Sequence, residues 1–229
     1  IIFILSFILL FSCATVETKV NPEISSIEID ENKKFLTYLE NDWQKTLDDN
    51  PLFASYTGDK RNNNKISSND IDNFNKGKKS DEQSLKLLKS IDISKLSEEN
   101  KLNYKLKEFD LLSSIGTKDF PTYYLRLNQR GGIQSFYETG NRLVYTSKQD
   151  YFDWLNRLKQ FETNIYNALE INKEGLLNGH TQPKLVTRGV IAQLKSIIES
   201  DIDSNPYMKV FLDADDSLLT KDEKAIMIN

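Results

Sequence analysis

The chain has 229 residues, with 30 basic and 34 acidic side chains that give a formal net charge of −4. Because the two signs are interspersed along the chain, the concentrated basic face that nucleic acid requires is not expected. Cys13 is the only cysteine, so once its thiol is modified neither a disulfide nor a sulfur-based metal site can form.

The first thirteen residues have the pattern of a bacterial lipoprotein export signal. Residues 1–11 are apolar except for Ser6, and they lead into the lipobox Leu10-Phe11-Ser12-Cys13. The run is shorter than the about 20 apolar residues that a transmembrane helix needs, and a polar stretch follows it. We expect cleavage before Cys13, which then carries the acyl chains that hold the protein on a membrane.

The sequence divides into a signal at residues 1–13, a tether at 14–32 and a helical domain at 33–229. Ala14 after the cysteine, rather than Asp, favours the cell envelope and the periplasmic face of the outer membrane. The chain has neither an initiator Met nor a basic segment before the apolar run, so we expect that its natural start is missing. A helix opened by a capping box of Thr220 and Glu223 stops after about two turns, so we also expect the natural protein to continue beyond Asn229.

Helical periodicity begins with the apolar stripe Phe35, Leu39, Trp43 and Leu47, which Asn50-Pro51 ends. Residues 56–68 hold Gly58 and three consecutive Asn residues, which predicts a solvated loop. A further helical segment ends near Leu85 and Leu88. The next helix begins at an N-cap, Ser97, and its predicted inner face is Leu102, Leu106 and Phe109, with Gly116 as the residue after its end.

Residues 120–146 are interrupted by Pro121, Gly131-Gly132 and Gly140, which predicts an irregular segment with short helices. Ser147 and Asp150 form a capping box for a long helix that ends at Gly175 and Gly179. Its apolar stripe is Tyr151, Leu155, Leu158, Phe161, Ile165 and Leu169. Pro183 lies in the first turn of the next helix, whose buried face is Val186, Val190, Leu194 and Ile197. No strand is predicted, so the fold class is all-α, an irregular multi-helix domain.

Few residues in the chain carry recognisable chemistry. The lone histidine, His180, makes neither a zinc site nor a catalytic triad, so a structural or solvated role is expected at an interhelical turn. Asp213, Asp215 and Asp216 resemble a calcium loop, but Lys224 stands where the bidentate Glu belongs. No catalytic, cofactor-binding or metal-binding residue is therefore predicted, and tight zinc binding by this chain is not expected.

A cleft is a candidate at Arg130, Gly131, Gly132 and Tyr137. Glycines there could bring backbone amides close to a ligand, and the neighbouring aromatic side chains could line a cleft. A chain reversal that needs a positive φ is the alternative explanation for the glycine pair, and it is favoured over ligand contact.

Five short motifs in a fixed order resemble a large bacterial family, domain of unknown function eight-eight-five (DUF885), many of whose members are lipoproteins. The resemblance covers about residues 33–229. The motifs are Asp49-Asn50-Pro51-Leu52-Phe53-Ala54 with Thr57-Gly58; Leu127-Asn128-Gln129 with Gly131-Gly132-Ile133; Asp150-Tyr151 with Arg157-Leu158; Glu174-Gly175-Leu176 with Gly179, Thr181 and Pro183-Lys184; and Ser204-Asn205-Pro206-Tyr207 with Phe211. Lys184 stands where the family often has Arg, and the Asn run after Gly58 departs from the usual pattern.

Members of this family look like helical zinc peptidases, with a His-Glu-x-x-Pro-Gly-His-His motif in the C-terminal half that this chain does not contain. The resemblance thus implies zinc and a peptide substrate for a longer parent protein, with this chain forming one wall of the substrate cleft. The alternative is a non-catalytic, lipid-anchored lipoprotein that binds a peptide, glycan or partner. The presence of the histidine motif in the reading frame after Asn229 would decide between these two hypotheses.

Overall fold

The computed structural model describes residues 30–228, so the predicted signal, Cys13 and most of the tether lie outside the described residues. Within this range no β-strand occurs, which confirms the all-α fold class, and one isolated bridge joins Asn128 and Gly131. The α-helices are α1 (Glu31–Asp49), α2 (Pro51–Tyr56), α3 (Ile71–Leu88), α4 (Glu98–Thr117), α5 (Tyr137–Arg142), α6 (Lys148–Leu177), α7 (Lys184–Ile198), α8 (Lys209–Leu212) and α9 (Lys221–Ile228). Four 3-10 helices join them: η1 (Ile93–Lys95), η2 (Thr122–Leu125), η3 (Ile133–Ser135) and η4 (Ile202–Ser204).

Most helix starts lie where the capping residues predict them. The Ser97 hydroxyl accepts from the Asn100 amide, and Ser147 with Asp150 forms the predicted capping box of α6. The reciprocal bonds between Thr220 and Glu223 likewise open α9. Two details differ from the prediction: α1 begins at Glu31, inside the predicted tether, and α4 continues through Gly116 to Thr117 without a positive φ.

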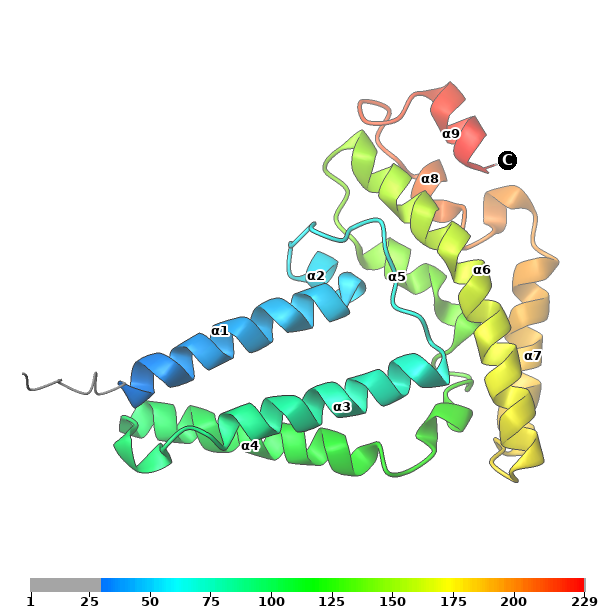
Figure 1. The fold of residues 1–229 in the computed structure, drawn as a ribbon. Coiled ribbons are helices and arrows are strands. Elements are labelled where there is room, and N and C mark those ends of the chain that lie inside the picture. The colour runs from blue at the N-terminus through cyan, green and yellow to red at the C-terminus, as the bar shows by residue number, and fades with distance from the viewer. Residues whose placement is uncertain (1–29, 229) are drawn as a thin grey trace, which may run out of the picture.

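The N-terminal helix group consists of α1 to α4 (Figure 1). α3 and α4 run antiparallel and pack along their length, while α1 contacts them at one end and diverges at the other. Its core consists of Phe35, Tyr38, Leu88, Ile91, Leu96, Tyr104 and Leu111. Burial of these side chains supplies the main favourable free energy for this group.

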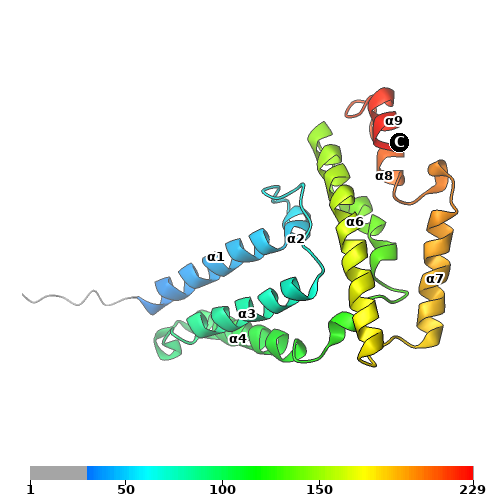
Figure 2. The same ribbon diagram turned by 45° about the vertical axis from the view of Figure 1, so that its right-hand side comes forward.

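The C-terminal helix group consists of α5 to α9, arranged around the long helix α6 (Figure 2). α7 returns antiparallel to α6, and η3 contacts both. Its core is a separate cluster of Tyr151, Trp154, Val210, Phe211, Ala214, Leu219 and Met227. Within the described residues α9 packs against this group, because Met227 is buried in the cluster and Lys148 pairs with Glu223 at 2.5 Å.

Three predicted helix faces need correction. In α4 the side chains of Leu102, Leu106 and Phe109 are 55–69% exposed, and the buried positions are Tyr104 and Leu111 instead. Trp43 in α1 is also exposed and packs edge-on against Phe53, with ring centroids 5.7 Å apart.

The predicted apolar stripe on α6 is buried only in the first half of the helix. Tyr151 and Phe161 are buried, whereas Ile165 and Leu169 are exposed. The predicted face of α7 is correct at Val190, which is buried, and Pro183 is the residue just before this helix rather than part of its first turn.

A polar junction joins the two helix groups, and its centre is Arg157 of α6, which is fully buried. The guanidinium donates to the backbone carbonyls of Pro51, Asn62 and Lys65 and to the Ser55 hydroxyl, at 2.6–3.4 Å. Burial lowers the pKa of Arg157. Because all these acceptors lie in residues 51–65, one side chain holds α2 and the following loop against α6.

Asp150 adds a second contact to this junction. Its buried carboxylate accepts from Lys60 at 2.6 Å and caps α6 through the amides of Thr146 and Ser147. Burial alone would raise the pKa of Asp150, but these hydrogen bonds outweigh it and lower the pKa to about 2.

No helix in the described part of the chain is long and apolar enough to cross a membrane.

Candidate functional site

A cavity of about 490 Å³ lies where α6 meets the irregular segment before α5. Four asparagines and three aromatic rings dominate its wall. The lining residues are Asn69, Tyr123, Arg126, Leu127, Asn128, Gly131, Gly132, Ile133, Phe136, Phe161, Asn164, Ala168, Ile171 and Asn172. The volume is in the range typical of small-ligand sites.

One face of α6 forms the longest wall of this cavity. Phe161, Asn164, Ala168, Ile171 and Asn172 recur at helical spacing, so their side chains leave the helix on the same side. The face combines three apolar side chains with two amides. This mixture gives a ligand both packing surface and hydrogen-bonding partners.

The opposite wall comes from the loop before α3 and is attached to α6 by paired amides. The Asn69 backbone amide donates to Asn164 Oδ1 at 3.2 Å, and Asn69 Nδ2 donates to the Asn164 carbonyl at 2.9 Å. Asn164 Nδ2 in turn donates to the carbonyl of Ser67 at 3.1 Å. The cavity therefore depends on the same junction between the helix groups that Arg157 holds.

A tight turn at residues 128–131 forms a third wall. Asn128 and Gly131 exchange backbone hydrogen bonds of 3.0 and 3.1 Å, and the Asn128 side chain accepts from the Arg130 amide. Buried Gln134 stabilises the turn, because its Nε2 donates to the Asn128 carbonyl at 2.6 Å. Gly132 follows with a φ of +135°, a conformation that side-chain-bearing residues rarely adopt.

Aromatic rings form the apolar part of the cavity. Phe136 stacks on Phe161 with centroids 4.0 Å apart and on Trp154 at 5.4 Å. Tyr123 packs against Phe74, whose ring also lies under the guanidinium of Arg126 at 5.6 Å. Arg126 is thereby held at the cavity wall as a cationic group.

Two buried acceptors beside this cavity, Asn69 Oδ1 and Gln134 Oε1, have no hydrogen-bond partner among the described residues. An unpaired buried polar atom costs about 1–3 kcal/mol, so such atoms are rare in folded proteins. Asn69 itself lines the cavity, and Gln134 follows the lining residue Ile133 in the chain.

The structure separates the four residues predicted to form a cleft. Gly131 and Gly132 line the cavity, whereas Arg130 is exposed on the turn and Tyr137 packs edge-on against Tyr207, 5.6 Å away. The positive φ at Gly132 supports the chain-reversal explanation for that glycine. Sequence reasoning missed the asparagines of α6, although Asn164 and Asn172 interrupt an otherwise apolar stripe.

The turn between α6 and α7 contains His180, as predicted. Its ring stacks on Tyr124 with centroids 5.4 Å apart and an interplanar angle of 10°. The Tyr124 hydroxyl donates to Glu174 at 2.6 Å, and this bond raises the pKa of Tyr124. Gly175 is required here, because a Cβ atom would lie 2.8 Å from the His180 carbonyl. These contacts give His180 a packing role.

The described residues contain no cluster that fits a zinc ion. Zinc requires three or four ligands, and no three His, Cys, Asp or Glu side chains come together as a metal site in residues 30–228. In the acidic turn, the Lys224 ammonium contacts the Ala214 carbonyl and Asp216, where a cation would have to be bound.

The fold is that of a helical protein with an amide-rich and aromatic cavity. Residues 51–227 match the family described as "Bacterial protein of unknown function (DUF885)". The chain therefore belongs to the DUF885 family. No curated protein and no solved structure matches the chain.

The glycine pair allows a matched test of the cavity wall. In Gly132→Ala, the alanine would have to keep the φ of +135°, which is strained for a residue with a side chain. Its Cβ atom would also lie 2.8 Å from both Gln134 Oε1 and Leu127 Cδ1. We expect a loss of about 1–3 kcal/mol in the free energy of unfolding, measured by urea titration. In Gly131→Ala, the added Cβ atom would have no neighbour within 4 Å, and Gly131 does not have a positive φ. The free energy of unfolding should therefore change by less than about 0.5 kcal/mol. Equal effects of the two substitutions would contradict this assignment.

Proposed function

We propose that this chain forms a peptide-binding wall of an envelope lipoprotein related to zinc-dependent peptidases. The observation that carries the proposal is the cavity at α6, which combines four asparagine side chains with three aromatic rings. Membership of DUF885 supports the proposal through the resemblance of that family to helical zinc peptidases.

Carboxamides match the chemistry of a peptide backbone. An asparagine side chain has an acceptor oxygen and a donor NH₂ group, the same pair of groups that a peptide backbone presents. Asn128 and Asn164 already use both groups within the protein, whereas Asn69 Oδ1 has no partner among the described residues. Asn172 uses its NH₂ group for the Ala168 carbonyl of its own helix, which leaves its oxygen available to a ligand within the described structure. The rings of Phe136 and Phe161 then offer an apolar surface to a peptide side chain.

The proposed role of this chain is binding rather than bond cleavage. The ligands for zinc and the general base would come from a histidine motif that the sequence does not contain. Lipidation at Cys13 would place the described domain close to the membrane, since only 17 residues separate this cysteine from the start of α1. Partners are therefore a membrane, reached through the lipid anchor, and a peptide.

Peptide binding is tested by filling the cavity from α6. We expect the chain to bind a fluorescein-labelled pentapeptide with a central phenylalanine, measured by fluorescence anisotropy. Ala168→Phe should weaken binding by about tenfold or more, because the new ring would occupy the space between Asn164 and Asn172. Ala192→Phe is the matched control, since it adds the same ring at an exposed position of α7.

Two outcomes would overturn this proposal. Equal affinity of the Ala168→Phe and Ala192→Phe variants would show that peptides bind elsewhere or not at all. Chelator-sensitive cleavage of a quenched peptide, or tight stoichiometric zinc binding in calorimetry, would show that this chain carries catalytic chemistry of its own.

Membrane attachment is tested separately at Cys13. In bacterial cells fed with labelled palmitate, the unaltered protein should incorporate label and fractionate with the outer membrane. A Cys13→Ala variant should incorporate none, because the acyl chains attach at this residue. Equal labelling of the two proteins would exclude lipidation at Cys13, and a purely inner-membrane signal would contradict the proposed location.

A further inference from the structure

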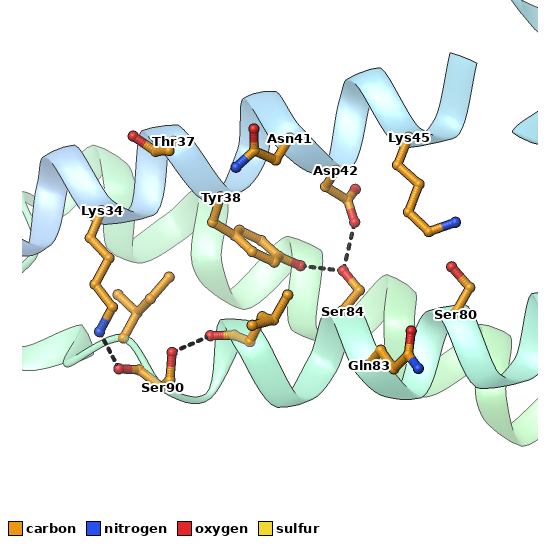
Figure 3. Close-up of a pocket in the computed structure, with 12 residues that line it drawn as sticks. Lys34, Thr37, Tyr38, Asn41, Asp42, Lys45, Ser80, Gln83, Ser84 and Ser90 are labelled. Atoms are coloured by element: carbon orange, nitrogen blue, oxygen red, sulfur yellow. Dashed lines mark hydrogen bonds between the residues drawn. The ribbon is translucent and has the colours of Figure 1, made fainter. Parts of the chain in front are cut away.

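The facing sides of α1 and α3 are unusual because most of the side chains between them are polar. α1 contributes Lys34, Thr37, Tyr38, Asn41, Asp42 and Lys45, which recur at helical spacing (Figure 3). α3 contributes Ser80, Gln83 and Ser84 from the facing side. Phe35 of α1 and Leu88 of α3 pack in the apolar core of this helix group. Beside that core, where α1 diverges from α3, the helices leave a groove lined mostly by polar side chains, to which Leu87 and Ile91 add apolar surface.

The groove has two chambers of about 320 and 440 Å³. Both are lined by Asp42, Lys45, Ser80 and Ser84, so they adjoin along one wall. Hydroxyl and amide groups continue into the second chamber with Thr46, Asn50 and Asn73. These volumes fit a small molecule rather than a macromolecule.

A chain of hydrogen bonds fixes the boundary between the chambers. The hydroxyls of Tyr38 and Ser84 lie 2.7 Å apart, and Ser84 donates to Asp42 at 2.6 Å (Figure 3). Lys107 of α4 pairs with the same carboxylate at 2.5 Å. Burial, with a contribution from the Asp42 charge, raises the pKa of Tyr38 to about 12, so this phenol stays protonated. The groove is therefore preorganised.

Charge in the groove favours an anion at one place, Lys76. Five lysines and three aspartates line the two chambers. Each aspartate is already paired with a lysine: Asp42 with Lys107, Asp81 with Lys118, and Asp49 with Lys45. Lys34 is paired with Glu31, which leaves Lys76 as the groove lysine without an ion pair in residues 30–228. Paired carboxylates offer little to a cation, whereas the unpaired ammonium of Lys76 attracts an anion.

We propose that this groove binds a small hydroxylated anion, such as a sugar phosphate or a sugar acid. The lysines would hold the anionic group, and the serine, threonine and amide side chains would pair with the ligand hydroxyls. Tyr38 is the one aromatic residue in the groove wall and is mostly buried, so stacking of a nucleobase is not favoured. The site is separate from the cavity at α6, which belongs to a different set of helices.

The test uses the full chain and three probes in isothermal titration calorimetry: glucose 6-phosphate, gluconate and uncharged glucose. We expect saturable binding of at least one anionic probe and at least about tenfold weaker binding of glucose, with affinity falling as salt is added. Lys76→Glu should weaken binding of the anionic probe by about tenfold or more. Lys79→Glu is the matched control, because it makes the same charge reversal on an exposed residue of α3 that does not line the groove.

Lys76 is exposed, so its substitution should leave the helical circular dichroism unchanged and a loss of binding can be read directly. Ala168→Phe, which fills the other cavity, should also leave anion binding unchanged. The proposal is overturned if neither anion binds, if glucose binds as tightly as glucose 6-phosphate, or if Lys79→Glu and Lys76→Glu weaken binding equally.

Discussion

The buried guanidinium of Arg157 is the interaction on which the arrangement of this protein depends. The two helix groups have separate hydrophobic clusters, so apolar burial stabilises each group without joining their cores. Arg157 supplies part of the missing connection through hydrogen bonds to three carbonyls and one hydroxyl in residues 51–65. A buried cation is costly unless its donors are satisfied, so α2 and its loop must lie in one place. This constraint fixes the loop that leads to Asn69.

Both candidate binding sites lie where packed helices leave polar space: one between the two helix groups and one within the N-terminal group. The α6 cavity forms at the junction itself, where Asn69 and Asn164 replace apolar packing with paired amides. The α1 and α3 groove forms where α1 diverges from its neighbours and polar contacts such as Asp42 with Ser84 bridge the gap beside the apolar core. A well-packed apolar interface would have filled both spaces. The polar residues at these interfaces thus weaken packing locally and create room for ligands.

The sequence predicted what depends on local chemistry. The caps at Ser97, at Ser147 with Asp150, and at Thr220 with Glu223 were correct, because each signal acts within four residues. The prediction of the buried face of α4 was wrong. Leu102 and Leu106 form a regular apolar stripe, but only tertiary contacts decide which face of the helix α3 covers. The asparagine pair of the cavity was missed for a similar reason, since Asn69 and Asn164 are 95 residues apart. Gly132 could be found, because positive φ is a local requirement.

The central claim, that Arg157 holds the loop and thereby the cavity wall, is tested most directly by hydrogen exchange on an Arg157→Met variant. Met keeps an unbranched apolar side chain but removes every donor to residues 51–65. The account predicts faster amide exchange across residues 51–69, while α4 in the other helix group keeps its protection because its core cluster is intact. Unchanged exchange in residues 51–69 would contradict the account, since the loop would then be held by contacts other than Arg157.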